Sequence, residues 1–185
     1  MPKERPTITS AAATPAGWSS ERSAELYGIN TWGAGYFDLS EQGEAQVNVD
    51  FGEHQVAVSI MDIVLGMRAR GLHMPAVLRI RNLLDHRIKL LNESFAQAIE
   101  QGGYQNTYRG VFPIKVNQQC HVIEEIADYG RRYHHGFEAG SKAELIIALS
   151  QLKDHDSLIV CNGYKDAEFI DLGLYARQMG IACFF

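Results

Sequence analysis

One lysine stands in an apolar segment that has the composition of a buried strand. Lys115 lies within residues 111–116, whose other members are all apolar. Burial in such a strand disfavours the charged ammonium, and the neutral amine is a nucleophile toward a carbonyl carbon. The segment therefore predicts a lysine that forms a Schiff base. The alternative, which composition alone favours, is a lysine whose stem lies along the strand end while its ammonium reaches solvent.

Acidic and hydroxyl side chains follow the next apolar segment. Glu138 ends a predicted strand over residues 136–138. Because the carboxyl ends of parallel strands meet at one edge of a sheet, we expect Glu138 to face the same mouth as Lys115. Its carboxylate would there hydrogen-bond a cofactor or hold the lysine ammonium, and a solvated loop charge is the simpler alternative. Ser141 and Glu144 have the S-x-x-E spacing of a capping box, which accounts for both residues without catalysis.

The remaining candidate residues are better explained by turns, helix caps or packing than by catalysis. Asn162 and Gly163 have the composition of a turn after a third apolar segment, and Asp166 is suited to cap the following helix. His134 and His135 have no third ligand at metal spacing, so the sequence predicts no metal site. The chain has 3 cysteines, too few and too unevenly spaced for a disulfide framework or a zinc site, which favours a reducing compartment.

From residue 104 onward, segments with strand and helix patterns alternate. This alternation predicts a parallel sheet covered by helices, in an α/β fold. An open doubly wound sheet and a (β/α) barrel both fit it, and a complete (β/α)8 barrel needs about 250 residues. The predicted strands cover residues 111–116, 136–138, 157–161 and 181–185, and the predicted helices cover residues 121–129, 142–149 and 166–179.

The residues before these repeats predict a smaller segment of mixed structure. Residues 1–22 are rich in small and polar types and are predicted to be a mobile leader. The predicted division is therefore a leader over 1–22, an amino-terminal β and helical segment over 23–103, and the repeats over 104–185. In the middle segment we expect a hairpin over residues 37–49, a helix over 56–67, a strand over 74–80, and a long helix over 84–99 that Gly102 and Gly103 close.

Composition excludes several classes of protein. The chain has 185 residues, of which 46% are hydrophobic, and this excludes disorder as an overall description. Its 17 basic and 22 acidic side chains leave a formal net charge of −5, so nucleic acid is not an expected partner. No segment has the apolar core of a signal peptide or the roughly 18 apolar residues of a membrane span. We expect no membrane partner and a cytoplasmic location.

Four motifs occur in an order that is specific to one family. Together they resemble the amino-terminal portion of the biosynthetic arginine decarboxylases, which are group IV decarboxylases dependent on pyridoxal 5'-phosphate (PLP). The resemblance extends over about residues 27–180. The motifs are YGINTWGAGYF at residues 27–37, FPIKVNQ at 112–118, EAGSKAEL at 138–145 and VCNGYKD at 160–166.

The resemblance implies a fold and a set of site residues. The implied fold is an incomplete PLP-binding (β/α)8 barrel of alanine-racemase type, preceded by the small β and helical segment. Lys115, on the first barrel strand, is implied to be catalytic and to hold PLP covalently. Glu138, Ser141 and Glu144 match positions around the cofactor. With this resemblance, the catalytic interpretation of Lys115 replaces the solvent-exposed one.

The implied reaction removes the α-carboxylate of L-arginine as carbon dioxide and leaves agmatine, for putrescine and spermidine synthesis. The family is also associated with magnesium and with homo-oligomers whose active sites lie between subunits. The matching region covers about the first quarter to third of the family's length, and further cofactor-binding groups come later. We therefore expect a truncated chain without useful activity of its own. Two alternatives are a decarboxylase or racemase for another basic amino acid, and a non-catalytic module that binds PLP or a partner.

Overall fold

The computed structural model describes residues 17–51 and 54–185, and the chain divides into two compact units. The first unit is Met1–Leu78 and the second is Arg79–Phe185. Most of the predicted leader, residues 1–16, lies outside the described residues. Its last residues enter the first helix, which begins at Ser20, because the Ser19 side chain accepts a hydrogen bond from the Arg22 amide and so caps the helix.

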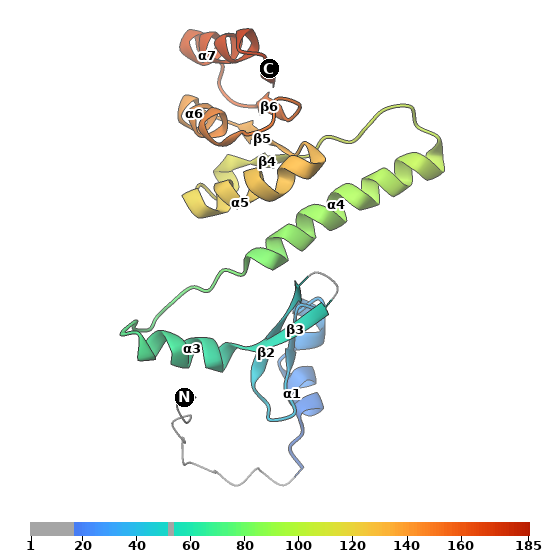
Figure 1. The fold of residues 1–185 in the computed structure, drawn as a ribbon, viewed down its shortest axis with the longest axis vertical. Helices are drawn as coiled ribbons and strands as arrows, with labels where there is room; N and C mark the ends of the chain where they lie inside the picture. Colours follow the sequence, from blue (N-terminus) through green and yellow to red (C-terminus); the bar gives the residue numbers. More distant parts are fainter. Residues whose placement is uncertain (1–16, 52–53) are drawn as a thin grey trace. The chain divides into compact units, whose positions relative to one another are not determined.

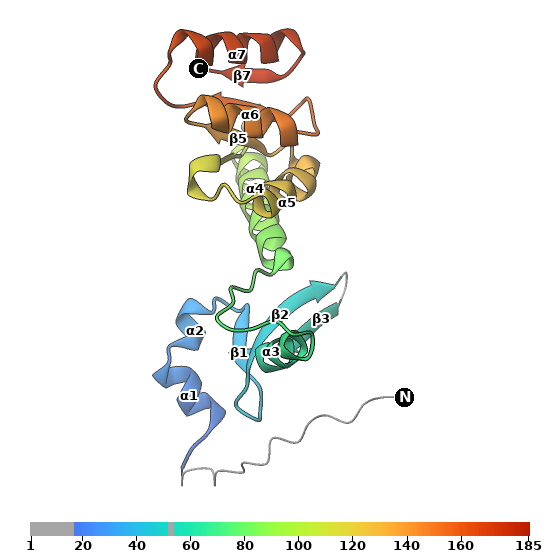
Figure 2. The same ribbon diagram turned by 90° about the vertical axis from the view of Figure 1, so that its left-hand side faces the viewer.

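The first unit contains a three-stranded antiparallel sheet in the order β1-β2-β3 (Figure 1 and Figure 2). Phe37 pairs with Val47, so the hairpin predicted over residues 37–49 is confirmed. On the middle strand Val47 and Val49 are buried, which is the alternation expected of a sheet with one covered face. The elements are α1 (Ser20–Leu26), α2 (Ile29–Trp32), β1 (Phe37–Leu39), β2 (Ala45–Phe51), β3 (His54–Ser59) and α3 (Ile60–Ala69).

Two predictions for this unit are wrong. The helix predicted over residues 56–67 begins only at Ile60, because Val56 and Val58 pair with β2 as part of strand β3. Apolar residues spaced by two and by four overlap in this segment, so the spacing did not separate strand from helix. The strand predicted over residues 74–80 is absent from the described structure. Val77 there is 80% exposed, so it has no second layer to pack against.

The second unit contains a four-stranded parallel sheet in the order β4-β5-β6-β7, with a helix between successive strands (Figure 1 and Figure 2). This confirms the predicted α/β class and the parallel sheet. The elements are α4 (Arg81–Gly102), β4 (Val111–Pro113), η1 (Ile114–Val116), α5 (Cys120–Gly130), η2 (Arg131–Tyr133), β5 (Gly136–Ala139), α6 (Lys142–Gln151), β6 (Leu158–Cys161), α7 (Ala167–Gln178) and β7 (Ala182–Phe184).

The core of the second unit lies between the parallel strands and their helices. Phe137 and Ile159 from the strands and Leu145 and Phe169 from the helices are at most 1% exposed. Full burial of each such side chain stabilises the fold by about 1.5–3 kcal/mol. Close approach of the central strands also requires glycine, because a Cβ on Gly136 would lie 1.8 Å from the Leu158 carbonyl oxygen.

Helix α4 belongs to this second unit by its packing. Ile88 is 6% exposed and joins the same core cluster as the strands. The helix ends where the sequence predicts, since Gly103 has a left-handed backbone with φ of 62°. The predicted boundary between residues 103 and 104, which separates the amino-terminal segment from the repeats, stays a prediction. Helix α4 lies in the same compact unit, Arg79–Phe185, as the repeats that follow it.

No helix within residues 17–51 and 54–185 is long and apolar enough to cross a membrane.

Candidate functional site

Lys115 lies just beyond the first parallel strand. Strand β4 ends at Pro113, and residues 114–116 form the short 3-10 helix η1, so the strand predicted over residues 111–116 is too long. Ile114 is fully buried, whereas the side chain of Lys115 is 54% exposed. The prediction that an apolar strand buries Lys115 is therefore wrong for this chain. The turn instead presents the amine at the carboxyl edge of the sheet.

Glu138 meets Lys115 at this edge. The Lys115 Nζ donates a hydrogen bond to Glu138 Oε1 at 3.3 Å. The two side chains come from neighbouring strands, because Pro113 and Glu138 are register partners in β4 and β5. The Glu138 side chain is only 7% exposed. The buried carboxylate is therefore the hydrogen-bond partner of an amine that is otherwise open to solvent.

Glu144 joins two backbone segments beside this pair. Its Oε1 accepts a hydrogen bond from Gln118 Nε2 at 3.1 Å, and its Oε2 accepts one from the Gly140 amide at 2.7 Å. The first partner follows η1 and the second follows β5. Glu144 therefore fixes the turn after Lys115 to the turn after Glu138. Gln118 was not predicted as a site residue, because a polar side chain after a strand gives no signal of its own.

Ser141 caps helix α6, as its spacing predicts. Its Oγ accepts a hydrogen bond from the Glu144 amide at 3.2 Å. In a capping box the glutamate would bond the amide of Ser141 itself, but here Glu144 bonds the amide one residue earlier, at Gly140. Ser141 is exposed. A contact between Ser141 and a cofactor stays a prediction.

Two glycines let the loops after β5 and β6 approach each other. A Cβ on Gly163 would lie 2.0 Å from the Gly140 carbonyl oxygen. A Cβ on Gly140 would lie 3.3 Å from Glu144 Oε2 and 3.9 Å from Glu138 Oε1. The Asn162 amide donates to the Ala139 carbonyl at 2.9 Å, which joins the same two loops. A side chain at position 140 would therefore crowd both carboxylates.

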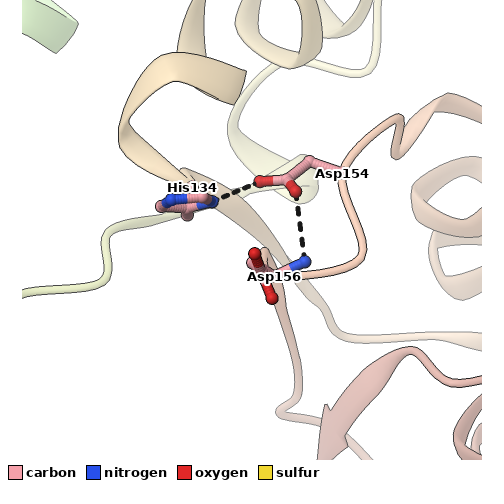
Figure 3. A group of neighbouring side chains, drawn as sticks. All are labelled: His134, Asp154 and Asp156. Atoms are coloured by element: carbon pink, nitrogen blue, oxygen red, sulfur yellow. Dashed lines mark hydrogen bonds and ion pairs between the residues drawn. The ribbon is translucent and has the colours of Figure 1, made fainter.

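A second polar group lies at the opposite edge of the same sheet. His134 precedes β5, and Asp154 and Asp156 precede β6 (Figure 3). The His134 Nδ1 lies 2.6 Å from Asp154 Oδ2. Because β5 and β6 are parallel, this group is at their amino ends, whereas Lys115 and Glu138 are at the carboxyl ends.

Comparison with known proteins shows the family to which this chain belongs. Residues 87–185 match the family described as "Pyridoxal-dependent decarboxylase, pyridoxal binding domain". The chain belongs to this family of pyridoxal-dependent decarboxylases. The match includes all four predicted site residues of the carboxyl edge, namely Lys115, Glu138, Ser141 and Glu144.

Within the pyridoxal-dependent decarboxylases, the chain is similar to biosynthetic arginine decarboxylases. It is 44% identical over 163 residues to that of Synechococcus sp. (strain RCC307) and 45% identical over 163 residues to that of Gloeobacter violaceus. Each alignment covers 88% of this chain and 25% of the relative. The chain therefore spans about a quarter of the length of these relatives.

A solved structure confirms the fold. The crystal structure of the biosynthetic arginine decarboxylase SpeA from Campylobacter jejuni matches with a TM-score of 0.76 and 32% sequence identity. The match covers 85% of this chain and 25% of that chain. The predicted fold class, part of a PLP-binding barrel, is confirmed.

The residues at the carboxyl edge fit a pyridoxal cofactor. Covalent attachment needs a reachable amine, and Lys115 is half exposed while Glu138 holds its Nζ. Gly140 places no side chain beside the two carboxylates, where a Cβ would lie 3.3 Å from Glu144 Oε2 and 3.9 Å from Glu138 Oε1. The fit rests on these contacts and on the family match together.

Proposed function

We propose that this chain forms the part of a PLP-dependent arginine decarboxylase that holds the cofactor covalently, through Lys115. The observation that carries the proposal is the pair of Lys115 and Glu138 at the carboxyl edge of the parallel sheet, with Nζ and Oε1 3.3 Å apart. The pair lies inside the region that is 44% identical to a biosynthetic arginine decarboxylase. When bound, PLP accepts the electron pair left by the departing carboxylate.

The chain's own residues orient the reacting amine. Glu138, which is buried, accepts a hydrogen bond from Lys115 and limits the positions that the amine adopts. Glu144 holds the turns on both sides of this pair through Gln118 and Gly140. Fixed geometry of this kind lowers the entropic cost of bringing reacting groups together. Glu138 and Glu144 are thus proposed to lie beside the cofactor, and Ser141 caps helix α6, which carries Glu144.

Decarboxylation is proposed for the whole protein, and we expect little from these 185 residues by themselves. The Lys115 side chain is 54% exposed to water. Pyridoxal chemistry of this kind proceeds best in a site that excludes water, because electrostatic interactions are stronger there. In the relatives, we propose that residues outside the matched quarter cover the equivalent lysine.

The experiment compares two proteins for release of labelled carbon dioxide from L-arginine with PLP. One is the 185-residue chain, and the other is the Synechococcus relative with its matching quarter replaced by this chain. We expect activity from the second protein alone, lost on Lys115→Ala and retained on Lys165→Ala. Equal activity with and without Lys115 would refute the proposal. L-Ornithine and L-lysine, tested in parallel, decide between arginine and another basic amino acid as substrate.

Three further properties belong to this proposal. We propose that the protein works in the cytoplasm, assembles as a homo-oligomer and uses magnesium together with PLP. The support is the resemblance to biosynthetic arginine decarboxylases. Light scattering of the purified protein tests the oligomer, and activity after removal of divalent ions tests the need for magnesium.

A further inference from the structure

Three potential metal ligands meet at the amino edge of the parallel sheet. His134 comes from the turn before β5, and Asp154 and Asp156 come from the loop before β6 (Figure 3). One nitrogen or oxygen atom from each side chain lies within 4.8 Å of the other two. Two loops that are 20 residues apart in sequence therefore place an imidazole and two carboxylates around one point.

No described lysine or arginine forms an ion pair with this group. The only described basic side chain that pairs with Asp154 is His134, and Asp156 has no ion-pair partner among the described residues. Lys153, the nearest lysine in sequence, pairs instead with Asp128 on α5. Two carboxylates beside an imidazole thus leave a negative local charge that favours a cation.

The orientation of Asp154 does not depend on a bound ion. Its Oδ2 accepts a hydrogen bond from Ser157 Oγ at 3.0 Å, and its Oδ1 accepts one from the Asp156 amide at 3.2 Å. Ser157 is 1% exposed, so this support is anchored in the core. Carboxylates that bind metals are commonly oriented by outer hydrogen bonds of this kind.

We propose that His134, Asp154 and Asp156 bind one divalent transition-metal ion, with Zn²⁺ as the representative ion. One imidazole nitrogen and two carboxylate oxygens supply three ligands, and water completes a tetrahedral site. A metal ion binds only an unprotonated imidazole nitrogen, so the ligating nitrogen of His134 releases any proton it carries to solvent on binding. The imidazole favours zinc, cobalt or nickel over magnesium and calcium, which prefer oxygen ligands. This inference does not depend on the proposed decarboxylase function, because the site lies at the other end of the sheet.

A bound ion would join the loops that precede β5 and β6. Because the unfolded chain does not bring the three ligands together, binding stabilises the folded state, and the stabilisation grows with the logarithm of the ion's concentration once that concentration exceeds the dissociation constant. The expected consequence is a thermal midpoint that rises with added Zn²⁺. We therefore assign the ion a structural role, which is to hold together the loops before β5 and β6.

The test is calorimetric titration of the metal-free 185-residue chain with zinc chloride, followed by magnesium chloride. We expect one Zn²⁺ per chain, with affinity at least about tenfold weaker in each of His134→Asn, Asp154→Asn and Asp156→Asn. Asparagine is chosen at position 134 because the backbone there has φ of 52°, which asparagine tolerates well. His121→Asn, an exposed histidine on α5, is the matched control and should bind like the unmodified chain.

Several outcomes would overturn the proposal. They are no Zn²⁺ binding by the unmodified chain, equal binding by His134→Asn, equal weakening in the His121→Asn control, or Mg²⁺ binding as tight as Zn²⁺ binding. Circular dichroism of each variant shows that it is folded. The thermal midpoint gives a second readout, since added Zn²⁺ should raise it in the unmodified chain and in His121→Asn but not in Asp154→Asn.

Discussion

Replacing Asp85 by asparagine should make the protein more stable at alkaline pH. Asp85 on α4 lies beside Glu125 on α5, which is 6% exposed. Burial, together with the hydrogen bond and the negative charge of Glu125, raises the pKa of Asp85 from 3.8 to about 6. Its Oδ1 is buried without a hydrogen-bond partner. Arg81 pairs with Glu125 and only partly offsets the repulsion between the carboxylates.

The sign of the pH dependence follows from this raised pKa. The unfolded chain releases the Asp85 proton near 3.8, whereas the folded protein keeps it until about 6. The free energy of unfolding therefore falls as pH rises between these two values. The full difference corresponds to about 3 kcal/mol. Solvent that reaches this partly buried side chain screens the charge, so we expect about 1 kcal/mol.

Urea unfolding followed by circular dichroism measures this effect. At about pH 8, Asp85→Asn should be about 1 kcal/mol more stable than the unmodified chain, and at about pH 4 the two should be equal. Asp128→Asn is the matched control, because the hydrogen bond from Lys153 lowers the pKa of Asp128. Replacing the Asp128 carboxylate should therefore lower the free energy of unfolding at pH values above the ordinary aspartate pKa. A gain for Asp85→Asn that is the same at both pH values would refute the electrostatic explanation.

Two other substitutions test the loops that carry the candidate site. Gly163→Ala should destabilise the second unit by several kcal/mol, roughly 3 or more, because its Cβ would lie 2.0 Å from the Gly140 carbonyl oxygen. Gly102→Ala, where a Cβ meets no atom within 4 Å, should instead leave the urea midpoint unchanged or slightly higher. Ser141→Ala should cost about 1 kcal/mol, since the Glu144 amide loses its cap. An unchanged midpoint for either Gly163→Ala or Ser141→Ala would contradict the contacts described for that residue.

Periodic patterns in the sequence predicted the parallel unit well. Helix α4 and its closing glycine, and the strands that contain Phe137 and Ile159, lie where apolar spacing and turn residues place them. These segments combine an unambiguous period with a strong stop signal, so local preference and tertiary packing agree. The hairpin that pairs Phe37 with Val47 was predictable for the same reason.

The errors arose where local spacing was ambiguous or contacts were distant. Valines at 56 and 58 fit a strand and a helix equally, and only pairing with β2 decides between them. Lys115 follows a buried residue at a strand end, and composition alone did not show that the chain turns there into η1. His134 meets Asp154 only because two parallel strands bring their preceding loops together. No spacing rule within one segment could have signalled that group.

Covalent trapping of PLP on the 185-residue chain tests the central claim most directly. The chain is incubated with PLP, reduced with borohydride and digested, and the modified lysine is identified by mass spectrometry. We predict one major label, on Lys115, which is absent in Lys115→Ala, reduced in Glu138→Gln and unchanged in Lys165→Ala. Lys165 is the matched control because it is an exposed lysine at the carboxyl edge of the same sheet. Label spread evenly over the lysines, or undiminished in Lys115→Ala, would contradict the assignment of Lys115 as the cofactor's anchor.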